Sequence, residues 1–202
     1  RRKWSGAYSM RSYPAGINQE IASAPIYAIA EWGWNNQGRN AREFGEAWAI
    51  KTGFEHPEKV GQWFELVAPI EYDVYGSCYA PDKNGWTSYI SEEVPASKKR
   101  THSPLGRGYY RYYKSKSSFN QKYQSLEKAL AVANAMGSQK LASETKMMMS
   151  FVKQSEAGNQ IAAAICNGIL TEKEFSKSIS QSMQALEQAI SLRKEAINEK
   201  ND

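Results

Sequence analysis

The stretch FNQKYQSLEKALAVA, residues 119–133, decides the fold, because its apolar residues recur with the spacing of a packed helix. These residues are separated alternately by four and three positions: Phe119, Tyr123, Leu126, Leu130 and Ala133. Such a heptad seam is typical of a helix that packs along other helices. The segment from Ser117 onward is therefore predicted to be helical.

Two further helices are predicted downstream. Gly137 and Ser138 end the first helix and cap the second, which carries a similar seam and continues past Gly158. Thr171 and Glu174 form a capping-box pattern at the start of the third. Its predicted buried stripe is Phe175, Ile179, Met183, Leu186, Ile190 and Ile197. Because the connections are short, residues 117–202 are predicted to form an antiparallel three-helix bundle or a long helical hairpin.

The first half of the chain has a different composition, with all six tryptophans before residue 87 and all seven prolines before residue 105. Asn40 and Glu43 form a capping-box pattern at the start of a short helix that ends at Gly53. Another helix is predicted from Pro57 to near Pro69. An earlier helical segment, residues 17–32, contains Pro25, which should kink or split it.

A β-hairpin is predicted after these helices. Ile70, Tyr72 and Val74 alternate with polar residues, and a second alternating run, residues 86–91, follows a turn cluster at 81–85. The fold class is thus predicted as α+β and predominantly α. Three regions are expected: 1–95, mixed helix and hairpin with a basic N-terminal arm; 96–116, a basic, tyrosine-rich linker; and 117–202, the helical bundle.

Length and composition bound the class of protein. The 202 residues are 41% hydrophobic and 23% charged, which is typical of a soluble folded chain. No apolar run approaches the roughly 20 residues that span a bilayer. Cys78 and Cys166 either form a disulfide or are two ordinary thiols. The chain starts at Arg1 instead of methionine, which predicts a processed or truncated chain. The location is left open by the sequence, with the envelope, the extracellular space and a virion among the alternatives.

The net charge of +5 is concentrated at the N-terminus and in residues 98–116, where tyrosines alternate with cations. Cations neutralise phosphates and tyrosine rings stack on bases or sugars, so this stretch is a candidate polyanion or nucleic-acid contact. The alternative is a packed entry segment whose cations are solvated. The candidate binding residues are Arg107, Tyr109, Tyr110, Arg111, Tyr112, Tyr113 and Lys114.

The segment 31–36, Glu-Trp-Gly-Trp-Asn-Asn, is a second candidate contact. Tryptophan faces stack on sugar rings and asparagine amides bind hydroxyls, a combination that suits a glycan. The alternative is a helix end followed by a loop, with the tryptophans anchored in the core.

Glu71, Asp82 and Thr87 form the third candidate site, with two carboxylates and a hydroxyl around the predicted hairpin. The order of residues in 71–87 resembles that of phage-type lysozymes. By that resemblance Glu71 is the general acid and Asp82 the carboxylate that stabilises the developing cation. Pro69 departs from the family, which has an intact helix at this point.

Other catalytic chemistry has little support in the sequence. His56 and His102 have no second ligand at zinc spacing, and no phosphate-binding loop, dinucleotide fingerprint or nucleophile elbow is present. No metal site or cofactor is therefore predicted. The preferred hypothesis is a non-catalytic structural or interaction subunit of a larger assembly, such as a virion or secretion machine, whose partners are other protein subunits. The alternatives are a lysozyme-type glycan hydrolase and a nucleic-acid or polyanion binder.

Overall fold

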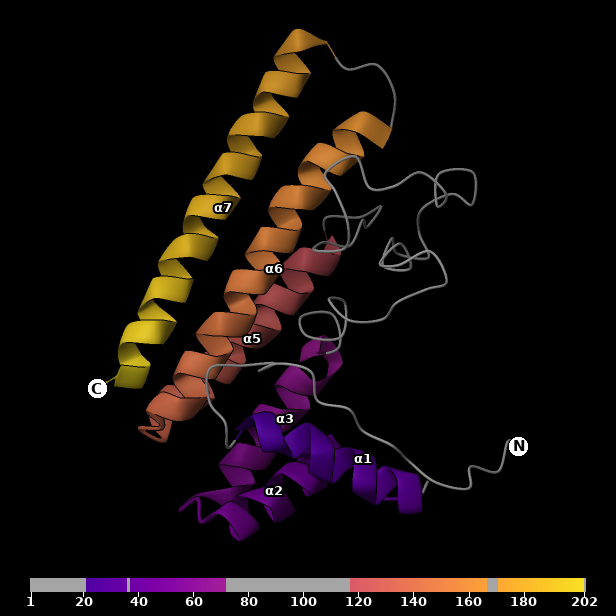
Figure 1. Cartoon of the computed structure of the whole chain (residues 1–202), viewed down its shortest axis with the longest axis vertical. Coiled ribbons are helices and arrows are strands. Elements are labelled where there is room, and N and C mark those ends of the chain that lie inside the picture. The colour runs from indigo at the N-terminus through magenta and orange to yellow at the C-terminus, as the bar shows by residue number, and fades with distance from the viewer. Residues whose placement is uncertain (1–20, 36, 72–116, 167–170, 202) are drawn as a thin grey trace.

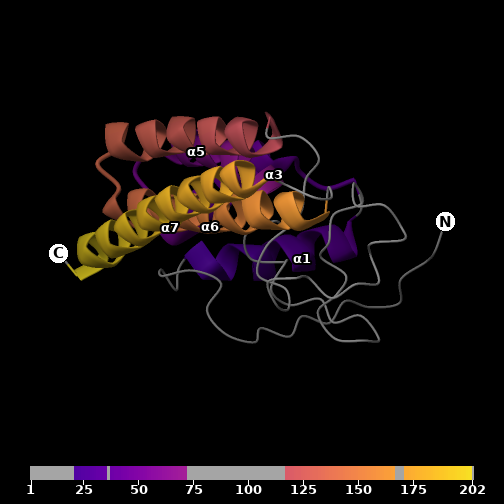
Figure 2. The same ribbon diagram turned by 90° about the horizontal axis from the view of Figure 1, so that it is seen from above.

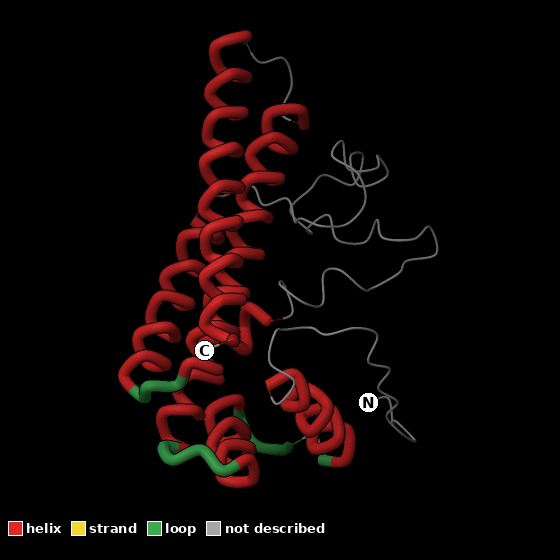
Figure 3. Tube along the Cα trace, turned by 60° about the vertical axis from the view of Figure 1, so that its left-hand side comes forward, coloured by secondary structure: helices red, strands yellow, loops and turns green. Residues whose placement is uncertain are grey.

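A computed structural model describes residues 21–35, 37–71, 117–166 and 171–201. Within these ranges the protein is all-α, with six α-helices and one short 3₁₀ turn and no β-strand (Figure 3). The α content of the predicted fold is confirmed there. The predicted hairpin beyond Glu71, the linker and the N-terminal arm lie outside the described residues.

The N-terminal helices begin and end where local cap chemistry dictates. The 3₁₀ turn Ile21–Ser23 leads into α1, Ala24–Trp34, so the proline at position 25 lies in the first turn of a new helix. Helix α1 thus extends into the segment predicted to be a loop after Trp32.

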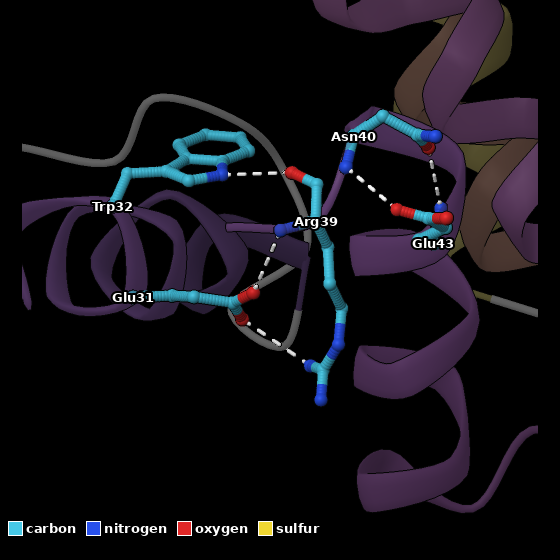
Figure 4. Close-up of polar contacts among 5 residues, drawn as sticks. All are labelled: Glu31, Trp32, Arg39, Asn40 and Glu43. Carbon is cyan, nitrogen blue, oxygen red and sulfur yellow. Dashed lines mark hydrogen bonds and ion pairs between the residues drawn. The ribbon is translucent and has the colours of Figure 1, made fainter. Parts of the chain in front are cut away.

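Helix α2, Ala41–Thr52, has the predicted capping box, because the Asn40 side chain accepts from the Glu43 N–H at 2.9 Å and Glu43 accepts from the Asn40 N–H at 3.0 Å (Figure 4). Its C-terminal Gly53 has a φ of 82°, a conformation that favours glycine.

Helix α3, Pro57–Glu71, corrects the sequence prediction at its C-terminal end. Pro69 was predicted to end the helix and Ile70 to start a strand, but both residues are helical. Proline this close to a helix end removes only one backbone donor, and Ile70 is buried on the same apolar face as Val67. Packing of that face outweighs both the proline and the alternating pattern.

Aromatic side chains hold α2 against α3. Phe64 is central, with ring centroids 5.8 Å from Phe44, 5.4 Å from Trp48 and 5.2 Å from Trp63, each at a steep interplanar angle. Edge-to-face pairs of this kind stabilise beyond the area they bury. The helices approach closely because Gly45 faces Phe64, where a Cβ would lie 2.7 Å from the ring atom Cδ2.

The C-terminal helices are α5, Ser117–Ala135; α6, Gln139–Cys166; and α7, Glu172–Asn201. Helix α6 packs along both neighbours, and α7 runs antiparallel beside it while α5 lies behind it in the view of Figure 1 (Figures 1 and 2). Every residue from Leu141 to Ser150 except Lys146 is buried, so α6 is the central helix. The predicted helix ends at Gly137 and Thr171 are confirmed.

Helix α3 joins the two groups of helices by packing on α5 and α6. The Trp63 indole N–H donates to Thr145 Oγ1 on α6 at 2.8 Å, and both residues are fully buried. Ser125 of α5 donates to the Leu66 carbonyl at 2.9 Å. The buried residues of α2, α3, α5 and α6 thus belong to one continuous core.

Candidate interaction surface

Most of the side chains predicted to act in chemistry lie outside the described residues. This holds for Asp82, Thr87 and all seven residues of the stretch from Arg107 to Lys114. Glu71 is the last residue of α3, so Pro69, the departure from the lysozyme pattern noted above, does not interrupt the helix. The hydrolase and polyanion sites therefore stay predictions.

The tryptophan segment after residue 30 is an anchored helix end in the structure. Trp32 donates from Nε1 to the Arg39 carbonyl at 2.9 Å, and its ring lies 5.5 Å from that of Phe44. The Glu31 carboxylate accepts from the Arg39 backbone N–H at 3.4 Å and pairs with its guanidinium at 3.3 Å (Figure 4). These contacts close the loop onto the start of α2, which favours a helix end followed by a loop over a glycan site. The predicted anchoring in the core does not hold for Trp32, which is 42% exposed.

Helix α7 shows the largest departure from the sequence prediction. The face that packs on α6 is made of small residues: Ser182, Ala185, Ala189 and Ala196, all buried. They are spaced by three, four and seven positions, which is also a heptad pattern. Small side chains allow the two helix backbones to approach closely.

Polar contacts reinforce this α6–α7 interface. The buried Ser182 hydroxyl donates to the Ala157 carbonyl at 2.9 Å. Arg193 donates to Gln154 Oε1 at 3.0 Å, and its guanidinium lies 4.7 Å from the centre of the Phe151 ring. Because these bonds need the observed rotation of α7 about its axis, they fix which of its faces meets α6.

The large apolar residues of α7 are consequently exposed, and the prediction that they form its buried stripe is wrong. Ile190 is 54% exposed and Met183 53%. The exposed residues, which we call the α7 stripe, are Phe175, Met183, Leu186, Ile190 and Ile197. Ile179, the sixth residue of the predicted stripe, is half-buried. The stripe lies about 100° round the helix from the small-residue face, since most of its members follow a buried residue by one position.

Charged residues border the α7 stripe on the side away from α6. Glu187 and Lys194 are exposed and lie seven positions apart on this border. Among the described residues, neither forms an ion pair. An apolar stripe with a charged border is the arrangement of a helix that packs on another protein surface.

The described part of the chain offers little that suits catalysis. A hollow of about 300 Å³ lies between the α2–α3 and α5–α6 turns, with His56 and Lys140 in its lining. A second, of about 260 Å³, lies between α6 and α7 and is lined mainly by glutamine side chains. No group of three potential metal ligands occurs among the described residues, and no described helix has the length and apolarity to span a membrane.

Comparison with known proteins adds no assignment. No family model, no curated protein and no solved structure matches the chain. The site therefore has to be judged on its own geometry.

Beside α6, on the side of α5, a second group of polar side chains surrounds Tyr123. Burial raises the pKa of its hydroxyl, and the nearby carboxylates of Glu127, Glu156 and Glu195 raise it further. The Lys153 ammonium lies 4.5 Å from the centre of the Tyr123 ring and pairs with Glu156 at 2.9 Å. A neutral tyrosine under a cation is a packing contact.

The sequence contained a signal for the true α6-facing side of α7. A second set of residues repeats with spacings of three and four: Ser182, Ala185, Ala189, Leu192 and Ala196. Each of them except Leu192 stands one position before a larger apolar residue. The larger apolar residues were predicted to be buried because larger side chains fill a core more often. Helix α7 thus carries two parallel apolar seams, and within the described chain only the small-residue seam packs on another helix.

Proposed function

We propose that this chain is a non-catalytic structural or interaction subunit of a larger protein assembly, and that the α7 stripe binds another subunit. The observation that supports the proposal is the exposure of five large apolar side chains on one face of a 30-residue helix. Single apolar residues scattered on a surface need no explanation, whereas five that share one face of one helix favour an interaction site.

The size of the surface agrees with this role. Covering the stripe would remove on the order of 400 Å² of apolar surface from water, which is about 10 kcal/mol of gross hydrophobic free energy before the costs of association. The remainder of α7 is held by small side chains and hydrogen bonds, so the stripe is not needed to attach the helix to α6.

The finer features predicted from the sequence belong to this proposal as well. We propose that a β-hairpin lies in the region after α3 and that the basic, tyrosine-rich stretch 98–116 provides a second contact. An assembly subunit with a helical scaffold and such a stretch would fit a virion, a secretion machine or another multi-protein complex.

The proposal is tested by fractionating a native extract by size and detecting this chain. We expect the wild-type chain in particles much larger than its 22.7 kDa. A Met183→Lys/Ile190→Lys double variant should move to the size of the free chain, while circular dichroism shows unchanged helix content. Ser191→Lys is the matched control, because residue 191 is exposed but lies about 100° further round the helix. A wild-type chain that fractionates as a free monomer would contradict the proposal.

A further inference from the structure

We infer that the partner bound by the α7 stripe is a second copy of this chain, packed antiparallel with a two-fold axis beside Ile190. This inference rests on the proposed function and specifies the partner. The described α7 is long enough for such a contact, because with this axis it overlaps its counterpart over residues 179–201, about 33 Å at 1.5 Å per residue.

Three residues of the stripe are spaced symmetrically about Ile190. Met183 lies seven positions before Ile190 and Ile197 seven after it, and all three are roughly half exposed. A two-fold interface brings the same surface of both chains together, so a residue a given number of positions before Ile190 faces the residue the same number of positions after Ile190 in the other copy. Ile190 then faces Ile190 of the second copy, and Met183 faces Ile197. Of the other stripe residues, Leu186 lies opposite position 194 of the second copy, and Phe175 lies beyond the overlap of the two helices.

The charges on the border of the stripe fit the same register. Glu187 lies three positions before Ile190 and Lys194 four positions after it. In the antiparallel pair Glu187 therefore lies opposite Lys194 of the second copy, within about one residue or 1.5 Å. Two opposite-charge pairs result, one on each side of the axis. In a parallel pair the two-fold axis would run along the helices. Glu187 and Lys194 of one copy would then lie on the opposite border from those of the other copy, and neither pair would form.

The contact area predicts a weak dimer. Two helices that pack over this length bury roughly 1,000 to 1,200 Å², at the lower limit for specific interfaces. A dissociation constant on the order of micromolar is expected. Such a contact forms readily when many copies are gathered in one assembly, where the effective concentration is high.

The test is sedimentation velocity on the purified full chain over a wide concentration range at about 0.1 M salt, where charge effects persist at short range. The wild-type chain should shift from monomer to dimer as concentration rises. Glu187→Lys and Lys194→Glu, each alone, should raise the dimer dissociation constant about tenfold. The double variant Glu187→Lys/Lys194→Glu should restore it, because the two charges exchange places. Ser191→Lys should leave it unchanged.

Each other outcome has a defined meaning. A dimer that does not respond to the charge reversals overturns the antiparallel register. A purified chain that is monomeric at every concentration, although native extracts hold it in large particles, overturns the second copy and leaves the proposed function standing with a different protein as partner. A monomer in both experiments overturns both proposals, as would be seen if another segment of the same chain covered the stripe.

Discussion

Replacing Thr145 by valine should destabilise the protein far more than the loss of one hydroxyl suggests. Thr145 Oγ1 accepts the indole N–H of Trp63 at 2.8 Å and donates to the Leu141 carbonyl at 2.6 Å. Valine has nearly the same shape, so the substitution opens almost no cavity. It removes the acceptor of an indole whose residue is only 1% exposed, and no water can take its place.

The magnitude follows from the cost of a buried polar group without a partner. An orphaned buried donor costs about 1–3 kcal/mol. The Leu141 carbonyl keeps its helical N–H donor, so its loss of the hydroxyl adds little. We expect the free energy of unfolding to fall by about 2 kcal/mol, which is a large part of the 5–15 kcal/mol typical of a domain.

The assay is urea unfolding of a double-mutant cycle with Trp63→Phe. Phenylalanine has no N–H, so Thr145→Val in that background should cost only about 0.5 kcal/mol, and the coupling between the two sites should be about 1–2 kcal/mol. Equal costs of Thr145→Val in both backgrounds would refute the reasoning. They would mean that Trp63 and Thr145 do not form the bond that links α3 to α6.

Three further predictions concern the packing and capping of the helices. Gly45→Ala should lower the free energy of unfolding by about 1–3 kcal/mol in urea, because the new Cβ meets Phe64, and a gain in stability would show that α2 and α3 are further apart. The pKa of Glu174 is held below its ordinary value by hydrogen bonds from the capping hydroxyl and then the capping backbone N–H. The stability that this cap contributes is therefore fully present above the unfolded pKa and is lost as pH falls through the folded pKa. An NMR titration that gives Glu174 an ordinary pKa would be inconsistent with the capping box. Ile190→Ala should cost the monomer less than about 1 kcal/mol and Ala189→Leu about 1–3 kcal/mol, measured below the dimerisation range, and the reverse order would place Ile190 in the core.

Helix ends were predictable from the sequence because cap chemistry is local. Asn40 with Glu43, and Thr171 with Glu174, provide reciprocal side-chain and backbone bonds within four residues. Because both partners of each bond lie three positions apart in the sequence, the pattern can be found without knowing the tertiary fold. Gly137 likewise ends a helix with a left-handed backbone conformation, with a φ of 65°, which glycine adopts easily.

The rotation of α7 was not predictable by residue size. Both Ala189 and Ile190 belong to heptad seams, and only the shape of α6 decides which seam it accepts. The α6 surface accepts the small seam because Arg193 and Ser182 have hydrogen-bond partners there. Such complementarity between surfaces is tertiary information that a single helical pattern does not contain.

The prediction of where α3 ends was wrong for a related reason. The alternation of Ile70 with later residues indicates a strand locally. In the folded chain Ile70 is buried in the core and continues the apolar face of α3. Tertiary burial outweighs local pattern at such boundaries. The carboxylate pair and the basic, tyrosine-rich stretch stay predictions, because all of their residues except Glu71 lie outside the described part of the chain.

The most direct test of the central claim, that the α7 stripe is an exposed contact surface, is the thiol reactivity of Ile190→Cys and Ala189→Cys variants of the full chain. Peptide mapping separates these thiols from Cys78 and Cys166. In dilute solution the position-190 thiol should react at nearly the rate of a free cysteine, and the position-189 thiol roughly a hundredfold more slowly, since it becomes accessible only by local opening. As concentration rises, reactivity at 190 should fall while reactivity at 189 stays constant. Protection of position 190 in dilute solution, equal to that of 189, would contradict the account.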